Sequence, residues 1–530
     1  MRQAVIPHLA SSLNTLNGVA AQDSKTTKDP TMQLNFIANT PQPSASGQTL
    51  AVIDPSDGQA FDQIQRSNAA DIDTAVAAAR HCFDSTWRKI SAAERGRLLM
   101  KLSNRVSAGV DELTALEQRD CGKPTKQARA DAVALARYFE FYAGACDKLH
   151  GDTLPYLDGY SVLTWREPHG VTGHVIPWNY PMQIFGRSVG GALAAGNVCV
   201  VKPAEDACLS LIRVAQMAAE VGFPPGAINI VTGYGHEAGD ALARHSGIDH
   251  ISFTGSPSIG TLIQQVAAQR HCPVTLELGG KAPAIVCDDF PLRTAAERIM
   301  FVKLLNAGQI CTTVDHAWLP AGKVDEFVAL ARGIVARRYA QLSSPDYTSI
   351  IDQRSFDRLL AALDEARSRG ARVLSLMPGP AFDAASRKIA PHIVLDAHPD
   401  CALMQREIFG PILPLRSYSG LDEVIASINA GPRPLAVYPF SYDPVQVQKI
   451  IDHVMSGGVS VNDALFHVGQ HDLPFGGVGD SGMGHYHGHE GFETFSKMRP
   501  VFYQARWSSL KFLMPPYGKL ADRVLAFLIQ

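Results

Sequence analysis

The hydrophobic pattern changes character along the chain. In the N-terminal part, apolar residues recur at helical spacing in alanine-rich stretches at residues 71–80, 92–107 and 130–145. From residue 171, short β-branched runs alternate with amphipathic stretches at residues 210–221 and 237–243. The runs predict strands at residues 171–176, 198–201, 228–231, 248–253 and 274–278. Strands that alternate with helices predict a parallel sheet of βαβ units with helices on both faces.

A second alternation begins after Asp289. Helical patterns at residues 292–306 and 324–337 are interleaved with extended runs at 317–320 and 372–376, which predicts a second α/β domain. Residues 473–484, LPFGGVGDSGMG, are too rich in glycine for a regular element and predict an ordered loop. The fold class is therefore expected to be α/β, with more than one domain.

Composition narrows the class of protein. The chain has 530 residues, of which 46% are hydrophobic and 19% charged, as in soluble globular proteins of two or three structural units. The net charge of -3, without a long basic or acidic run, gives no support for nucleic-acid binding. No stretch approaches 18 uninterrupted apolar residues, so a membrane-spanning helix is not expected.

The cysteines and the two chain ends indicate where the protein works. Nine cysteines are scattered without a CxxC pair or zinc spacing, which predicts reduced thiols, a cytoplasmic location and no metal site. Residues 1–31 are rich in Ser, Asn and Ala, make a poor signal peptide and are expected to be disordered. The tail, residues 507–530, has an apolar face, for which we favour packing on its own or a partner subunit over a membrane interface.

Three residues are candidates for catalysis. Cys311 in NAGQICTT follows a turn that would expose a nucleophilic thiol, although most cysteines in such a chain are inert buried residues. Glu277 in LELGGK lies at a strand end, where burial would raise the pKa of its carboxyl group and suit it to activate water; a surface cap is the alternative. Asn179 in PWNYP offers an amide donor for an oxyanion, or is a simple turn residue.

Other motifs suit a dinucleotide. Lys202 and Glu205 in VKPAE lie just past a strand, where dinucleotides bind to α/β sheets. FTGSPSIG, residues 253–260, turns from a strand into a helix whose free N–H groups could hold a pyrophosphate, although it is not the GxGxxG fingerprint. EIFGPILP places Glu407 and Phe409 before a Gly-Pro pair.

Taken together and in this order, PWNYP, KPAE, FTGS, ELGGK, GQIC, EIFGP and PFGG closely resemble the aldehyde dehydrogenase superfamily, from about Val52 to Pro500. The C-terminal half, with PDYTSIID, RKIAP, RPLA and LPFGGVGDSGMGHYHG, is most similar to coniferyl aldehyde dehydrogenases and the related class 3 branch. The N-terminal half, with VIDPSDGQAF, is more similar to the class 1/2 and betaine-aldehyde type.

The resemblance implies a domain organisation. It implies an aldehyde dehydrogenase-like α/β fold with a Rossmann-type NAD-binding domain at residues 46–148 and 169–279 and a catalytic α/β domain at 280–484. A small β flap for oligomerisation, into a homodimer or homotetramer, would comprise residues 149–168 and 485–500. Residues 1–45 would then form the disordered leader and residues 501–530 the C-terminal tail.

The resemblance also implies residue roles. Cys311 resembles the nucleophile and Glu277 the general base, while the Asn179 amide and the Cys311 N–H resemble the oxyanion hole. The cofactor, NAD with NADP possible, is expected to contact Ile176, Pro177, Trp178, Lys202, Glu205, Gly235, Gly239, Phe253, Gly255, Ser256, Ile259, Leu278, Glu407 and Phe409. The aldehyde is expected to contact Tyr180, Gln183, Ile184, Arg187, Ile310, Thr312 and Phe475.

The expected reaction oxidises an aldehyde, preferably aromatic or otherwise extended and apolar, to its carboxylic acid through a thiohemiacetal and a thioester on Cys311. A thioester passed to coenzyme A would need no water-activating base, so Glu277 argues against a CoA-acylating enzyme. The intact set of Cys311, Glu277 and Asn179 argues against a non-catalytic protein that keeps the fold. Arg187 leaves two readings open: a contact for a substrate carboxylate, as in semialdehyde dehydrogenases, or a structural arginine paired with a neighbouring carboxylate, which we favour.

Overall fold

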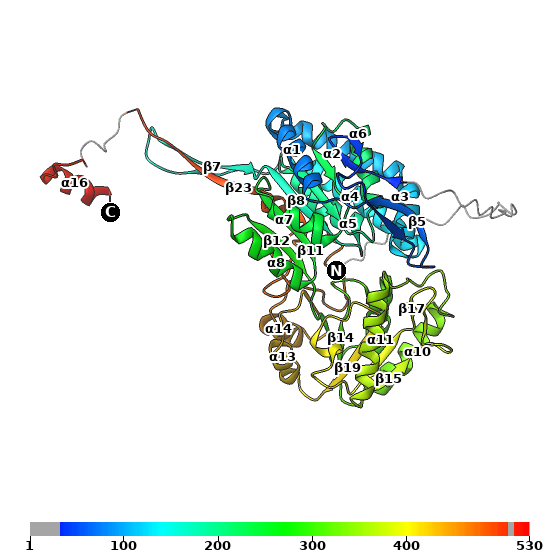
Figure 1. Cartoon of the computed structure of the whole chain (residues 1–530). Helices are drawn as coiled ribbons and strands as arrows, with labels where there is room; N and C mark the ends of the chain where they lie inside the picture. Colours follow the sequence, from blue (N-terminus) through cyan, green and yellow to red (C-terminus); the bar gives the residue numbers. More distant parts are fainter. Residues whose placement is uncertain (1–31, 507–513, 529–530) are drawn as a thin grey trace, which may run out of the picture.

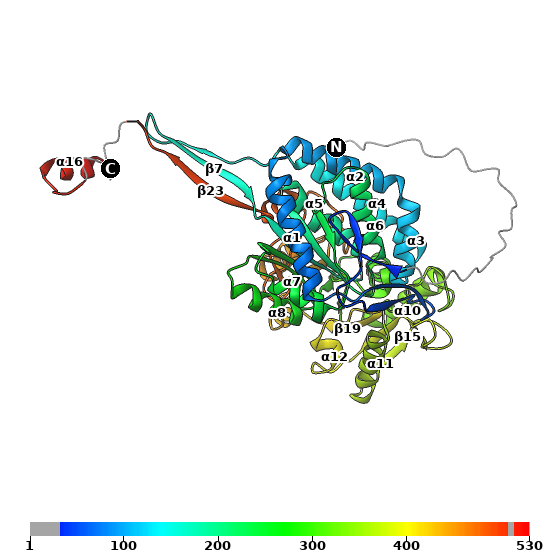
Figure 2. The same cartoon turned by 45° about the horizontal axis from the view of Figure 1, so that its top comes forward.

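The computed structural model describes residues 32–506 and 514–528, which form two α/β bodies and a projecting arm (Figure 1). The expected disorder of residues 1–31 lies outside the described residues. In Figure 1 the first body, drawn in blue to green, lies above the second, drawn mainly in yellow-green to brown. Figure 2 shows the arm extending away from both bodies.

An eight-stranded sheet forms the centre of the first body. Its order is β22-β12-β11-β8-β9-β10-β2-β3, and the five strands from β12 to β10 are parallel. Their β-branched side chains are almost entirely buried, as expected for a parallel sheet covered on both faces. The sequence analysis predicted all five parallel strands, β8 to β12. The whole sheet comprises β2 (Asn35–Ile37), β3 (Thr40–Gln42), β8 (Val171–Ile176), β9 (Val198–Pro203), β10 (Ile228–Ile230), β11 (His250–Gly255), β12 (Val274–Leu278) and β22 (Gly482–Met483).

Two groups of helices cover this sheet. One group packs α2, α3 and α4 onto α5 and α6, and the other contains α1, α7 and α8. Apolar residues of these helices join the strands in one continuous core. The helices are α1 (Ala69–Ser85), α2 (Ala92–Ala108), α3 (Val110–Cys121), α4 (Thr125–Ala145), α5 (Pro181–Ala194), α6 (Leu209–Glu220), α7 (Asp240–Arg244) and α8 (Pro257–Ala268), with short turns η1 (Trp87–Lys89) and η2 (Gly235–Gly239).

The predicted leader is wrong for residues 32–45. Phe36 and Ile37 are buried, and Phe36 pairs with Ile230 in the sheet. The fully buried Asn35 exchanges hydrogen bonds with Ser67 and accepts one from the Thr232 backbone. These contacts order a segment that is polar in sequence. A second sheet nearby contains β1 (Met32–Gln33), β4 (Thr49–Ile53) and β5 (Ala60–Gln65).

The second body confirms the predicted second α/β unit. Its seven strands follow the order β15-β18-β19-β14-β13-β20-β21, all parallel except β15 at one edge. The strands are β13 (Pro283–Val286), β14 (His316–Pro320), β15 (Arg372–Ser375), β18 (His392–Leu395), β19 (Ile412–Tyr418), β20 (Ala436–Phe440) and β21 (Gly458–Val459), beside a hairpin of β16 (Phe382–Asp383) and β17 (Lys388–Ile389). The helices are α9 (Leu292–Leu304), η3 (Leu305–Gly308), α10 (Val324–Arg338), α11 (Gln353–Ser368), α12 (Ala402–Gln405), α13 (Leu421–Asn429) and α14 (Pro444–His453).

The arm is an antiparallel sheet of β6 (Thr153–Leu154), β7 (Ser161–Pro168) and β23 (Ser496–Tyr503). The predicted second flap segment, residues 485–500, is wrong at both ends. Residues 485–495 include α15 (Gly488–Thr494), and the buried Phe492 and Phe495 anchor them in the core of the first body. The strand then pairs with β7 as far as Tyr503.

The described part of the tail forms helix α16 (Lys519–Leu528) beyond the arm. Leu520, Leu525 and Phe527 are exposed there, so packing of this apolar face on a partner subunit stays a prediction. Within residues 32–506 and 514–528, no helix is long and apolar enough to cross a membrane.

Candidate active site

A tight turn presents Cys311. Helix α9 ends at Leu304, two residues earlier than predicted, and Asn306, Ala307 and Gly308 then adopt positive φ angles of 49°, 52° and 76°. Such a conformation is costly for residues with a side chain, so the surrounding structure must hold it. Gly308 is required, because a Cβ there would lie 2.4 Å from the Gly410 carbonyl oxygen.

Buried Gln309 holds this turn in place. Its side-chain amide donates to the carbonyls of Asn306 and Ser349, both at 3.1 Å, and its Oε1 accepts from the Ile351 N–H at 3.1 Å. Cys311 follows two residues later and remains partly exposed. The turn predicted to expose this thiol is therefore present, with every polar group of Gln309 used to fix it.

Asn179 lies beside the same turn. It follows β8 in the PWNYP segment, and Pro181 begins α5. The side chain is buried, and its Nδ2 donates to the Gln309 carbonyl at 3.2 Å. An amide donor from the first body is thus fixed against the carbonyl of Gln309, which precedes Cys311 by two positions in the sequence.

Glu277 is buried on β12. Neither carboxylate oxygen has a hydrogen-bond partner among the described residues. Burial raises the pKa of Glu277 well above its ordinary value, and the charge of Arg187 opposes that shift. Burial likewise raises the pKa of Cys311 to about 12; Arg187 lowers it, while Glu407 and Glu277 raise it further. These four groups therefore act on one another electrostatically.

Arg187 on α5 is buried, with its guanidinium 5.2 Å from the centre of the Phe475 ring. Within the described part of the chain it makes no hydrogen bond or ion pair, and its Nε is buried without a partner. The favoured interpretation, a structural arginine paired with a carboxylate, finds no such partner there. A buried cation without a counter-ion is costly.

The expected adenosine end of the cofactor site is assembled at the ends of β9 and β10. Buried Lys202 Nζ lies 2.8 Å from Glu205 Oε2. Gly239 approaches Lys202, since a Cβ there would lie 3.8 Å from the lysine side chain. Burial alone would raise the pKa of Glu205, but Lys202 outweighs it and lowers that pKa, so the carboxylate is charged.

The expected phosphate turn joins β11 to α8. Phe253 and Gly255 end the strand, and Ser256 precedes the helix without capping it through its side chain. The first backbone N–H groups of α8 are therefore free for an anion. Ile259 is exposed on the first turn of α8, while Leu278 packs against Gly260, where a Cβ would lie 2.5 Å from the Leu278 side chain.

Residues of the two bodies meet at the expected nicotinamide end of the cofactor site. The Glu407 carboxylate lies against Gly279, where a Cβ would be only 1.9 Å from Oε2. Phe409 packs its ring edge-on against Trp178 at 5.4 Å. Ile176 and Pro177 lead from β8 into that contact. Burial raises the pKa of Glu407 to about 8, and its Oε1 has no partner among the described residues. An acceptor left free here and free N–H groups on α8 fit the ribose hydroxyls and phosphates of a dinucleotide.

The expected substrate residues divide into two groups. Ile310 and Thr312 flank Cys311 and are buried, and the Tyr438 hydroxyl donates to the Thr312 carbonyl at 2.5 Å. Arg187 and Phe475 lie together, as described above. In contrast, Ile184 packs in the core, while Tyr180 and Gln183 contact Lys123 and Asp131. Contact of these last three residues with an aldehyde stays a prediction.

An aromatic and histidine cluster beside Phe475 was missed in the sequence. His487 stacks on Phe475 at 5.5 Å and its Nε2 lies 3.0 Å from the Tyr138 hydroxyl. His471 packs against Tyr138 at 4.4 Å. The recurring histidines of HYHGH, residues 485–489, were the available signal, but that segment was assigned to the flap.

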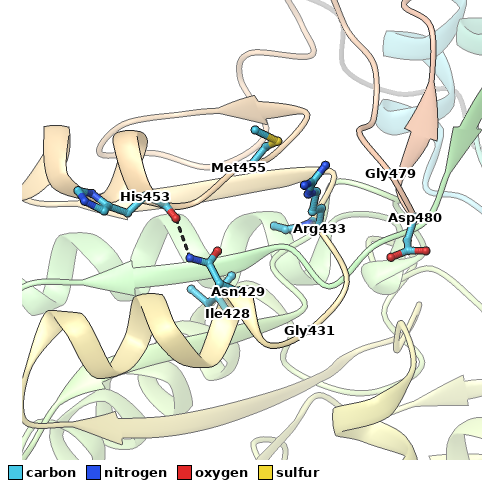
Figure 3. A pocket seen from close by; sticks show the side chains of 9 residues that line it. Ile428, Asn429, Gly431, Arg433, His453, Met455, Gly479 and Asp480 are labelled. Carbon is cyan, nitrogen blue, oxygen red and sulfur yellow. Dashed lines mark hydrogen bonds between the residues drawn. The ribbon is translucent and has the colours of Figure 1, made fainter.

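A surface pocket of about 490 Å³ lies elsewhere, where the ends of α13 and α14 meet the glycine-rich loop (Figure 3). Asn429 donates to the His453 carbonyl at its rim, and Arg433 and Asp480 lie at the other end of the view. None of its lining residues belongs to the set predicted for catalysis or cofactor binding.

Comparison with known proteins agrees with this geometry. The model of the aldehyde dehydrogenase family matches residues 42–501. The chain belongs to the aldehyde dehydrogenase family. It is 43% identical over 68% of its length, and 74% of the relative, to a Pseudomonas aeruginosa protein named "Probable coniferyl aldehyde dehydrogenase". It is 34% identical to the mitochondrial benzaldehyde dehydrogenase of Antirrhinum majus over 86% of each chain.

Solved structures of this family have the same fold. An NAD-dependent aldehyde dehydrogenase from Sinorhizobium meliloti matches with a TM-score of 0.87 and 30% identity, covering 94% of this chain and 98% of that one. The NAD⁺ complex of a Bacillus cereus aldehyde dehydrogenase matches with a TM-score of 0.86 and 29% identity, over 90% and 97%. The protein is thus an oxidoreductase that acts on aldehydes with NAD as its cofactor, as the motifs predicted.

Proposed function

We propose that Cys311, Asn179 and Glu277 carry out the oxidation. The Cys311 thiol first loses its proton to solvent, and the thiolate attacks the aldehyde carbon. The carbonyl oxygen then becomes an oxyanion that accepts hydrogen bonds from the Asn179 amide and the Cys311 N–H. NAD, when held by the residues named below, would supply the acceptor for the hydride of this carbon, and Cys311 would then carry a thioester. Glu277 removes a proton from water, the water oxygen attacks the thioester, and the acid departs as the thiol is restored.

The observation that carries this proposal is the hydrogen bond from Asn179 Nδ2 to the Gln309 carbonyl. It joins the PWNYP segment of the first body to the Cys311 turn of the second. The amide is therefore held beside the nucleophile before any substrate arrives, which is how an oxyanion hole lowers a barrier without reorganisation.

For the cofactor, Lys202 and Glu205 would hold the adenosine ribose, and Glu407 the nicotinamide ribose. The charged Glu205 carboxylate can accept hydrogen bonds from the ribose hydroxyls of NAD. It would repel the 2′-phosphate of NADP, so we expect NAD to be preferred.

For the substrate, we favour an aldehyde with an aromatic or extended apolar body. The aromatic side chains of Phe475, Tyr138 and His487 lie together beside Arg187 and would suit such a body. Relatives named for coniferyl aldehyde and benzaldehyde support this choice.

A second candidate is an aldehyde that carries a carboxylate at its far end. It is favoured by one observation, the buried guanidinium of Arg187 without a counter-ion among the described residues. A carboxylate would satisfy that charge with two hydrogen bonds.

A panel of three aldehydes separates the two candidates. NADH formation is followed with cinnamaldehyde, acetaldehyde and succinic semialdehyde, and kcat/KM is compared. The proposal expects cinnamaldehyde to be the best substrate. Equal values for cinnamaldehyde and acetaldehyde would contradict the apolar body, and a strong preference for succinic semialdehyde would establish the second candidate.

We also propose a cytoplasmic homodimer or homotetramer assembled through the arm. Trp165, Met498 and Phe502 are exposed there, and a protruding sheet with apolar side chains is typical of an interface. Sedimentation velocity of the purified protein tests this, because a monomer at micromolar concentration would refute it.

A further inference from the structure

A cluster of buried charges lies at the N-terminal end of α4. We call Glu117, Lys123 and Asp131 the charge cluster. Lys123 Nζ lies 3.2 Å from Glu117 Oε1 and 2.6 Å from Asp131 Oδ2, and all three side chains are almost completely buried. The Ser210 hydroxyl donates to the second oxygen of Glu117 at 3.0 Å. Neither the family motifs nor the catalytic scheme above uses this cluster.

The charge cluster contacts the segment that carries Asn179. Gln183 Nε2 donates to the remaining oxygen of Asp131 at 2.6 Å. Lys123 Nζ lies 4.0 Å from the centre of the Tyr180 ring, a cation–π contact. Next to the cluster, the Cys121 thiol donates to the Trp178 carbonyl at 3.2 Å. Residues 178, 180 and 183 are therefore each held by a contact with the charge cluster or with Cys121, and Asn179 lies among them in the sequence.

Stability alone does not explain such a cluster. Removing charges from water costs several kcal/mol, and well-packed apolar residues of similar volume often stabilise a protein as much or more. Burial raises the pKa of Glu117 to about 7, which reflects that cost. Burial would lower the pKa of Lys123, but Asp131 and Glu117 outweigh it and raise that pKa, so the ammonium remains charged. What charges add over apolar packing is directionality, because each carboxylate oxygen accepts a hydrogen bond in one arrangement.

We propose that the charge cluster is a positioning device, which fixes residues 178–183 so that the Asn179 amide stays at the place where the oxyanion develops. This inference rests on the proposed role of Asn179. Lys123, Glu117 and Asp131 act through Tyr180 and Gln183 and touch no reacting atom. An error of about 1 Å in the position of a catalytic group can reduce the rate about 100-fold, so the cluster controls the rate of thiohemiacetal formation.

The test uses the full-length enzyme and the pre-steady-state rate of NADH formation with saturating NAD and the best aldehyde of the panel. Lys123→Met keeps the length of the side chain and removes its charge. We expect the rate to fall about 10- to 100-fold while NAD affinity stays unchanged. Gln183→Leu leaves the charge cluster itself intact and removes only the hydrogen bond from Gln183 to Asp131. We expect the rate of NADH formation to decrease about 3- to 10-fold. The Gln183→Leu variant tests the proposal if Lys123→Met does not fold.

Ser103→Ala is the matched control. Ser103 Oγ donates to the Ala136 carbonyl of α4 at 2.8 Å, so this variant also removes one buried hydrogen bond to α4, away from the cluster. A merely structural effect on α4 would slow this variant as much as Gln183→Leu. We expect its rate to equal that of the parent.

A double-mutant cycle with Asn179→Ala identifies the route. If the cluster acts through Asn179, Lys123→Met or Gln183→Leu should change the rate less than about twofold in the Asn179→Ala background. Equal losses in both backgrounds, or parent rates in both cluster variants, overturn the positioning role. An unchanged rate in Asn179→Ala alone overturns the proposed oxyanion hole instead, so the two failures are distinguishable.

Discussion

Gly279→Ala tests how closely Glu407 is placed over the strand that carries Glu277. A Cβ at this position would lie 1.9 Å from Glu407 Oε2, against 3.4 Å or more in an ordinary contact. The carboxylate must therefore move by about 1.5 Å, which it can do because it is the end of a flexible side chain. A movement of this size would break a hydrogen bond that a hydroxyl of the nicotinamide ribose donates to Glu407, while the fold is kept.

Because burial raises the pKa of Glu407 to about 8, its carboxyl group is mostly neutral near pH 7. The loss of one neutral hydrogen bond amounts to about 0.5 to 1.5 kcal/mol, so NAD should bind about 2- to 13-fold more weakly. Titration calorimetry with NAD measures this directly. Gly333→Ala on α10, where a Cβ meets nothing within 4 Å, is the matched control and should bind NAD as the parent does. In the Glu407→Gln background, Gly279→Ala should reduce the affinity for NAD clearly less than it does in the parent. Parent affinity in a folded Gly279→Ala variant would refute the placement of Glu407 at the cofactor.

Three further predictions concern the nucleophile, its charge environment and cofactor choice. Cys311→Ala should abolish NADH formation while NAD still binds, because no other sulfur can attack the aldehyde; turnover within tenfold of the parent would refute the assignment. Arg187→Met removes the charge that lowers the pKa of Cys311, so that pKa should rise and the pH profile of alkylation by iodoacetamide should move to higher pH. An unchanged profile would show that Arg187 does not act on the thiol. The parent should prefer NAD over NADP by about 10- to 100-fold in kcat/KM, equal to about 1.4 to 2.7 kcal/mol, and Glu205→Gln should move the preference towards NADP. A parent that favours NADP would contradict the role of Glu205.

The regular elements were predictable because their signals are local. The five parallel strands of the first sheet were predicted from β-branched runs of four to six residues, and these strands are almost wholly buried. The signal for the turn before Cys311 was also local, because Gly308 and its neighbours favour a turn. Its detail was not, because the left-handed Asn306 and Ala307 are held by Gln309 through contacts to Ser349 and Ile351.

The errors arose where distant segments meet. Residues 35–37 form a strand because Phe36 pairs with Ile230, nearly 200 positions away. Residues 485–495 leave the arm because Phe492 and Phe495 are buried in the first core. Lys123 was not singled out in the sequence, because its contact with Tyr180 depends on the packing of α4 against α5. The hydrophobic pattern of a segment does not identify pairing partners or counter-ions that are distant in the sequence.

The central claim is that Cys311 carries the acyl group between hydride transfer and hydrolysis. Glu277→Gln should slow hydrolysis of the thioester by about 100-fold or more while hydride transfer continues. The most direct measurement is therefore intact-protein and peptide mass spectrometry of Glu277→Gln after brief mixing with NAD and cinnamaldehyde. The account predicts one added cinnamoyl group, located on the peptide of Cys311 and released by hydroxylamine. A burst of NADH without any adduct, or an adduct on another residue, would contradict it.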